Sequence, residues 1–284
     1  MTIKKRIILA CSIAALTCFL FSCNTRKASF STHELVQDMK LYKTPTNLWH
    51  SGDLFEHSVW VAQTIVKWFT EKHPFVEGID ESNKKVLVFA GFLHDIGKGG
   101  DQVYKYYTKP DHPQDGFNYL IGKKDYIVSK NNTRFDFKPW LKAQGFSDEE
   151  YRLITVLAGG HTLFGKNVLK PWRKKEKHPH ELFDDFVKNL ELLASQACYN
   201  NGVVTEQFVR MAVLISAADL YGMNPVKITF PIVCVELPEI QNYVPAPHQK
   251  EKIMYDVVNP EEDCLFLRKL FFEYFTEKDP KGFS

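Results

Sequence analysis

The chain has 284 residues, of which 44% are hydrophobic and 25% are charged, so it contains enough apolar material for a large folded domain. The formal net charge is only +2, which argues against a surface built for broad nucleic-acid binding, and we expect no nucleic-acid partner. The six cysteines have no spacing typical of a zinc knuckle or a disulfide framework. Their positions do not say whether Cys198, Cys234 and Cys264 include a disulfide.

The first residues have the pattern of a secretory signal. Lys4, Lys5 and Arg6 precede an apolar run from Ile7 to Phe21, as the charged and apolar regions of a signal do. The run is shorter than the roughly 20 apolar residues that a stable membrane-spanning helix needs. We therefore predict a signal over residues 1–22.

The end of this run has a motif of its own, Leu20-Phe21-Ser22-Cys23, followed by Asn24. A leucine three residues before a cysteine, with a small residue directly before it, resembles the lipobox of bacterial lipoproteins. The resemblance implies that Cys23 carries a lipid, begins the mature chain and anchors it in the cell envelope, outside the cytoplasm. In a host with two membranes, Asn24 in place of an aspartate after Cys23 implies, by resemblance to lipoprotein sorting, the outer membrane. An uncleaved anchor helix and a cleaved signal with an incidental Cys23 are the alternatives.

The next segment is polar and mixed, and we interpret residues 23–47 as a tether with one short helix around His33–Met39. From Asp53 to about Lys72, apolar residues recur at helical spacing, and Asp53 is a suitable N-cap. Residues 85–96 form a nearly continuous apolar run, which periodicity alone cannot assign to a buried strand or a buried helix.

The later segments are mostly helical in pattern. Residues 97–109 are typical of a loop, and residues 166–177 are basic and irregular. Pro113 suits the first turn of a helix, and Ser147 with Glu150 forms a capping-box signal. We expect helices in this part of the chain at His112–Leu120, Ser147–Ala158, Glu181–Tyr199 and Thr205–Leu220.

The pattern changes after residue 224, because prolines recur between residues 225 and 247 and break the chain into short extended pieces. A last helix is predicted from Pro260 to Glu277. We therefore predict a helical domain over residues 48–224 and a less regular C-terminal extension over residues 225–284.

Side chains that bind metals lie on separate predicted segments of the helical domain. They are His57, the adjacent pair His94 and Asp95, and Asp219, with His112 and His161 between them. Imidazole and carboxylate together suit divalent transition metals such as manganese, iron, nickel, cobalt or zinc. A bound ion of this kind lowers the pKa of a water molecule and places the resulting hydroxide opposite a phosphoryl group.

The order of these residues resembles a known family. Glu56-His57-Ser58, the stretch Leu93-His94-Asp95-Ile96-Gly97-Lys98 and Ala217-Ala218-Asp219 are similar to the H…HD…D signature of the HD-domain superfamily of metal-dependent phosphohydrolases. The match covers about residues 54–222. It implies an all-α HD-domain bundle in which the apolar run is a helix. It also implies that His57, His94, Asp95 and Asp219 are metal ligands.

A second motif resembles one HD subgroup. His112-Pro113-Gln114-Asp115-Gly116 looks like the HPxxG element of the subgroup that hydrolyses cyclic dinucleotides. The resemblance implies that Asp95 bridges two ions and that His112 and His161 complete the second site. It also implies that Lys98 lies near the phosphate, so Asp95 and Lys98 are the catalytic candidates. The chain departs from the subgroup after His161, where a second histidine and a Gly-Tyr-Pro triplet are missing.

We therefore expect a metal-dependent phosphohydrolase with one or two ions. Its substrate would be a small phosphomonoester or phosphodiester, with nucleotides and cyclic nucleotides as candidates. The alternative is a metal-bearing HD module that binds a nucleotide or an envelope partner without turnover. Taken singly, His57 and His161 also suit core histidines, His112 suits a helix start, and Lys98 suits a solvated loop.

Overall fold

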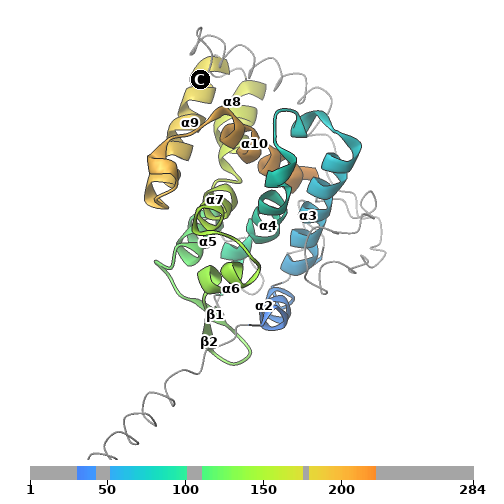
Figure 1. Ribbon diagram of the computed structural model, residues 1–284, viewed down its shortest axis with the longest axis vertical. Helices are drawn as coiled ribbons and strands as arrows, with labels where there is room; N and C mark the ends of the chain where they lie inside the picture. Colours follow the sequence, from blue (N-terminus) through green and yellow to red (C-terminus); the bar gives the residue numbers. More distant parts are fainter. Residues whose placement is uncertain (1–30, 43–51, 101–110, 175–178, 222–284) are drawn as a thin grey trace, which may run out of the picture. The chain divides into compact units, whose positions relative to one another are not determined.

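The computed structural model describes residues 31–42, 52–100, 111–174 and 179–221 (Figure 1). The predicted signal, Cys23 and the C-terminal extension with its last helix lie outside these ranges. Within them the chain is mostly helical, with one small two-stranded sheet, which confirms the predicted all-α fold. Across the same ranges, no helix has the length and apolar character that crossing a membrane requires.

Helix α3 (Leu54–Glu71) begins where its sequence predicts. The Asp53 carboxylate accepts a hydrogen bond from the Glu56 amide at 2.9 Å, and the Glu56 carboxylate accepts one from the Asp53 amide at 3.1 Å. This reciprocal capping box satisfies two amides that the first helical turn leaves without partners. Lys72 ends the helix in the left-handed conformation, with φ of 51°.

Helix α4 (Lys84–Leu93) is the buried centre of the domain. It lies between α3 and α7 (Asp148–Gly159) in Figure 1, and residues 86–93 are all buried, which explains their continuous apolar character. Gly91 allows α3 to approach closely, since a Cβ there would lie 2.6 Å from Cδ1 of Ile65. The apolar run is therefore a helix, as the family resemblance implied.

The other helices that were expected within the described residues are present. They are α2 (Thr32–Met39), α5 (His112–Leu120), α7, α9 (Pro179–Gln196) and α10 (Glu206–Tyr221). Ser147 and Glu150 form the predicted capping box at the start of α7. Short helical turns connect these elements: η1 (Pro74–Val76), η2 (Glu81–Asn83), η3 (Ile96–Lys98) and η6 (Asn200–Gly202).

The prediction of an irregular stretch over residues 166–177 was wrong for its described part. A π-helix, η5 (Gly165–Leu169), leads directly into α8 (Lys170–Arg173). Val168 and Leu169 are buried while Lys166 and Lys170 are exposed, so the segment has an apolar side and a basic side. Pro171 is the second residue of α8.

A hairpin and a helix were not predicted. Strands β1 (Tyr126–Val128) and β2 (Thr133–Phe135) pair antiparallel, with Tyr126 opposite Phe135, and α6 (Phe137–Ala143) follows them. Asn132 lies in the turn with φ of 52°. Strands of this length are too short to show a reliable alternation of apolar and polar residues.

Helix α2 packs beside the hairpin through a buried acid. Asp38 is 1% exposed, and its two oxygens accept hydrogen bonds from the Tyr126 hydroxyl and the Ser129 amide, both at 2.7 Å. Burial and the Asp38 carboxylate raise the pKa of Tyr126 well above its usual value, so the phenol remains a donor. The Tyr126 ring also lies against Gly99 and Gly100, which directly follow η3.

Removing the Tyr126 hydroxyl tests this link. Tyr126→Phe keeps the ring but leaves the buried Asp38 carboxylate with one donor fewer, so the free energy of unfolding should fall by about 1.5–3 kcal/mol. Tyr42→Phe is the matched control, because the Tyr42 hydroxyl pairs with the neutral Ser129 hydroxyl at 3.0 Å and should lose only about 0.5–1.5 kcal/mol. Urea unfolding measures both. Equal losses in the two variants would contradict the role given to Asp38.

Candidate metal centre

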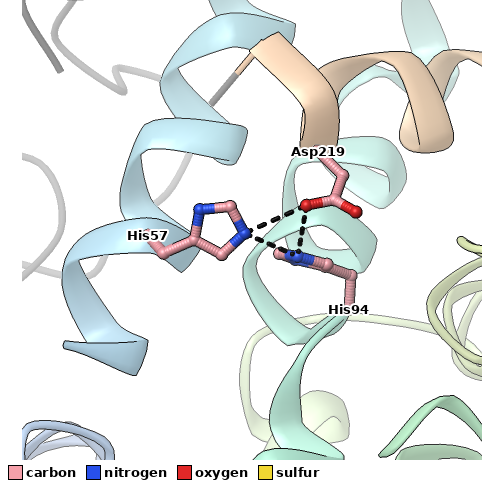
Figure 2. Close-up of side chains that lie close together, drawn as sticks. All are labelled: His57, His94 and Asp219. Atoms are coloured by element: carbon pink, nitrogen blue, oxygen red, sulfur yellow. Dashed lines mark hydrogen bonds and ion pairs between the residues drawn. The ribbon is translucent and has the colours of Figure 1, made fainter. Parts of the chain in front are cut away.

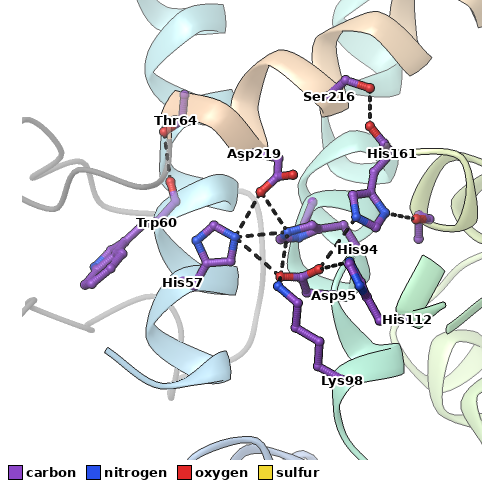
Figure 3. A network of polar contacts seen from close by, with 12 residues as sticks. His57, Trp60, Thr64, His94, Asp95, Lys98, His112, His161, Ser216 and Asp219 are labelled. Carbon is purple, nitrogen blue, oxygen red and sulfur yellow. Dashed lines mark hydrogen bonds and ion pairs between the residues drawn. The ribbon is translucent and has the colours of Figure 1, made fainter. Parts of the chain in front are cut away.

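The predicted metal-binding side chains converge at one place, although they come from five segments (Figure 3). Most of them sit at helix ends, where the backbone turns away and leaves space for a side chain. Their positions are His57 on α3, His94 at the C-cap of α4, Asp95 next to it, His112 as the first residue of α5, His161 just after α7, and Asp219 on α10.

His57, His94 and Asp219 form the first group (Figure 2). Nε2 of His57 lies 3.1 Å from Nε2 of His94 and 3.0 Å from Oδ1 of Asp219, and Nε2 of His94 lies 3.3 Å from the same oxygen. Two atoms that bind one ion at about 2.1 Å are about 3.0 Å apart at a right angle and about 3.4 Å apart at the tetrahedral angle. The spacing therefore suits three ligands of one ion.

Asp95 lies between this group and a second one. Its Oδ2 is 3.5 Å from Nε2 of His57 and 3.4 Å from Nε2 of His94. Its Oδ1 is 2.9 Å from Nε2 of His112 and 3.6 Å from Nε2 of His161. One carboxylate thus faces two sets of imidazole nitrogens, with a different oxygen toward each. This is the arrangement that a bridging ligand requires.

The protonation of two rings follows from their backbone partners. Nδ1 of His94 lies 2.6 Å from the Gly91 carbonyl oxygen, and Nδ1 of His161 lies 2.7 Å from the Ala158 carbonyl oxygen. A carbonyl oxygen only accepts, so each Nδ1 carries a proton, and in the neutral ring Nε2 presents a lone pair to the cluster. A backbone partner on the far nitrogen is typical of histidines that bind metals.

The surroundings of Nε2 of His161 show whether this cluster suits a metal ion. Its Nε2 is buried and has no hydrogen-bond partner within the described part of the chain, and the nearest acidic atom is Oδ1 of Asp95 at 3.6 Å. A buried lone pair opposite a carboxylate oxygen is unfavourable unless a cation lies between them. The residues present therefore fit a divalent ion.

Burial and charge set the pKa values of the histidines. Burial and the neighbouring His94 lower the pKa of His161 to about 3, and burial lowers the pKa of His57, so both rings stay in the neutral form that binds metals. Burial also opposes charge on His94, but the carboxylates of Asp95 and Asp219 outweigh it and raise its pKa to about 10. In the absence of an ion, a proton on His94 therefore offsets part of the acidic charge.

The two acidic residues remain ionised. Burial would raise the pKa of each, but their neighbours hold both well below the usual range. The charges of Lys98 and His94 lower the pKa of Asp95, and the charge of His94 and a hydrogen bond from His57 lower the pKa of Asp219. Lys98 lies in η3, is only 9% exposed, and donates a hydrogen bond from Nζ to Oδ2 of Asp95. A metal ion would take over the role that the Lys98 ammonium and the His94 proton have here.

Two contributions to this geometry were missed by the sequence interpretation. Gly97 packs on the first turn of α5, where a Cβ would lie 1.8 Å from the His112 carbonyl oxygen and 2.5 Å from the Gly116 amide nitrogen. This close approach brings His112 to Asp95. In the sequence, the only indication of it was the pair of glycines in the two motifs, Gly97 and Gly116. Ser216 on α10 donates a hydrogen bond to the backbone oxygen of His161, and no motif indicates it.

The comparisons with known proteins agree with part of this picture. The family model for the HD domain matches residues 54–130, a segment that contains His57, His94, Asp95, Lys98 and His112. The match supports the HD-domain superfamily of metal-dependent hydrolases for this segment, and it ends before His161 and Asp219. No curated protein and no solved structure gave a significant match.

The glycine contact can be tested by stability. In Gly97→Ala the new methyl group meets backbone atoms that cannot rotate away, so the free energy of unfolding should fall by about 3 kcal/mol or more. Gly165→Ala is the matched control, since a Cβ there meets nothing within 4 Å, and it should change stability by less than about 0.5 kcal/mol. Urea unfolding distinguishes the two. A Gly97→Ala protein as stable as the wild type would contradict the close packing of η3 on α5.

Proposed function

We propose that this protein is a metal-dependent phosphohydrolase that acts on a small phosphomonoester or phosphodiester, with nucleotides and cyclic nucleotides as the preferred candidates. The observation that carries the proposal is the buried Asp95 carboxylate, which faces two groups of imidazole nitrogens at distances suited to metal binding and also contacts the Lys98 ammonium. Phosphoryl transfer depends on concentrated positive charge around the phosphate oxygens.

The proposed ligands divide into two sets that share Asp95. His57, His94, Asp95 and Asp219 would hold one ion, and Asp95, His112 and His161 would hold a second. Manganese, iron, nickel, cobalt and zinc all suit imidazole and carboxylate ligands. Bound there, such ions lower the pKa of a water molecule and neutralise charge that develops on the phosphoryl group.

Lys98 would act on the substrate and not on the ions. Its Nζ contacts Asp95 in a buried setting, where a charge–charge interaction is stronger than in water. Positive charge from an ion on Asp95 would weaken this contact and leave the ammonium available to a phosphate oxygen. We therefore propose that Lys98 binds the substrate phosphate and stabilises the charge that builds up as the ester bond breaks.

The function is tested with the full-length chain purified in detergent and loaded with Mn²⁺. Elemental analysis gives its metal content, and a panel of phosphomonoesters, phosphodiesters and nucleotides gives its activity. We expect about two ions per chain and hydrolysis of one ester class, and Asp95→Ala should lower kcat/KM at least about 100-fold. Asp148→Ala is the control, because Asp148 pairs only with surface lysines in the described structure, Lys138 and Lys142, and it should retain full activity.

The other outcomes of this experiment are equally informative. Bound metal without turnover of any ester would favour the alternative, an HD module that binds a nucleotide or an envelope partner. Absence of metal after reconstitution would refute the ligand assignment. Lys98→Ala separates enzyme from binding module, because it should abolish turnover while leaving the ligand set, and so the metal content, intact.

We also propose that the chain is a lipoprotein of the cell envelope, anchored through Cys23 and facing outside the cytoplasm. The support is the sequence pattern of residues 4–23, which lies outside the described structure. Cys23→Ala should move the protein from the detergent phase to the aqueous phase in a partitioning assay, and the wild-type chain should carry the mass of a diacylglycerol. Identical partitioning of the two proteins would favour an uncleaved anchor helix.

A further inference from the structure

Helix α10 reaches the metal centre at two points. Asp219 belongs to the first group of ligands, and Ser216, three residues earlier, donates a hydrogen bond from Oγ to the backbone oxygen of His161 (Figure 3). Residues three apart lie on the same side of a helix, so both side chains face the cluster. Ser216 is 4% exposed, which makes its hydroxyl part of the buried structure around the ligands.

We infer that Ser216 is a positioning residue for His161 and that its hydroxyl sets how tightly the second ion is held. The inference rests on the proposed function, because it assumes the two-ion ligand set. Ser216 would not touch either ion or the substrate. It would act only through the backbone of His161.

His161 needs this support because of where it lies in the chain. It follows Gly160, the C-cap of α7, and precedes the π-helix η5, so it occupies a junction between two helical geometries. At such a junction the regular ladder of backbone hydrogen bonds ends, and the backbone is held by other contacts. The bond from Nδ1 to the Ala158 carbonyl oxygen orients the ring, and the bond from Ser216 ties the backbone to a different helix.

The distances show why a small displacement matters. Nε2 of His161 is 3.6 Å from Oδ1 of Asp95, whereas Nε2 of His112 is 2.9 Å from the same oxygen. His161 is therefore already the more distant member of the second group. Metal ligands must be held within about 0.5 Å of their working geometry, so a further shift of His161 weakens the second ion.

The first ion should not depend on this hydroxyl. Its ligands are His57, His94, Asp95 and Asp219, which contact one another, and the Ser216 side chain takes part in none of these contacts in the described structure. The hydroxyl of Ser216 has one other nearby acceptor, the Ala212 carbonyl oxygen at 3.2 Å on its own helix. Loss of the hydroxyl should therefore weaken the second ion, beside His112 and His161, and leave the affinity for the first ion unchanged.

The chain offers a matched control in Ser58. It lies on α3 next to His57 and is fully buried, and its Oγ has no hydrogen-bond partner among the residues that the structure describes. Ser58→Ala removes a buried hydroxyl beside a metal ligand without breaking a bond to that ligand. Ser58→Ala therefore removes the same group as Ser216→Ala, but it should not weaken binding of the second ion.

The experiment titrates the full-length chain, purified in detergent, with Mn²⁺. Elemental analysis after dialysis gives the number of ions, and electron paramagnetic resonance distinguishes a coupled ion pair from a single ion. The wild type and Ser58→Ala should bind two coupled ions. Ser216→Ala should bind the first ion normally and the second about 10–100-fold more weakly, with the signal of an isolated ion at low Mn²⁺. Ser216→Thr keeps the hydroxyl and should bind both ions.

Several results would overturn the inference. A coupled pair of wild-type affinity in Ser216→Ala would show that the hydroxyl does not matter, and so would loss of the second ion in Ser216→Thr. Equal weakening in Ser58→Ala would show a general packing effect. Failure of the proposed function looks different, since a wild-type chain that binds two ions but hydrolyses no ester would refute the enzyme and leave the role of Ser216 intact.

Discussion

The structure around the candidate metal centre depends on one buried charge, the carboxylate of Asp95. Removing an ionised carboxylate from water costs several kcal/mol, and the cost is met only when cations or strong donors surround it. Here the Lys98 ammonium and the imidazoles of His57, His94, His112 and His161 all face this group. A divalent ion on each side would replace this partial compensation with a complete one, which explains why so many nitrogen donors gather around one acid.

The same local arrangement positions two of the candidate ligands, His94 and His161. His94 closes α4 and His161 follows α7, and each ring donates a hydrogen bond from Nδ1 to the carbonyl oxygen three residues earlier, in Gly91 and Ala158. The last carbonyl groups of a helix lack partners within the helix, so a histidine at its end can use one and aim Nε2 outward. In each of these two buried helices, one hydrogen bond gives a C-terminal carbonyl oxygen a partner and also orients the histidine ring. This local arrangement explains how two histidines at distant sequence positions each present Nε2 to Asp95.

Much of the fold and the ligand set could be predicted from the sequence. The capping residues Asp53 and Ser147 and the helical spacing located the helices, and the HD signature named candidate ligands that the structure brings together. Other features have no reliable local signal. The continuous run of α4 is ambiguous because burial on all sides removes periodicity, the strands of the hairpin are too short to alternate, and the bond from Ser216 joins two segments that are distant in sequence.

The central claim is that Asp95 bridges two metal ions. Anomalous diffraction from crystals of the protein grown with Mn²⁺ tests it most directly, because it locates each ion independently of activity. The account predicts two peaks on opposite sides of Asp95, one among His57, His94 and Asp219 and the other beside His112 and His161, with Nζ of Lys98 displaced from Oδ2. A map with no peak at this cluster, and with Lys98 still bound to Asp95, would contradict it.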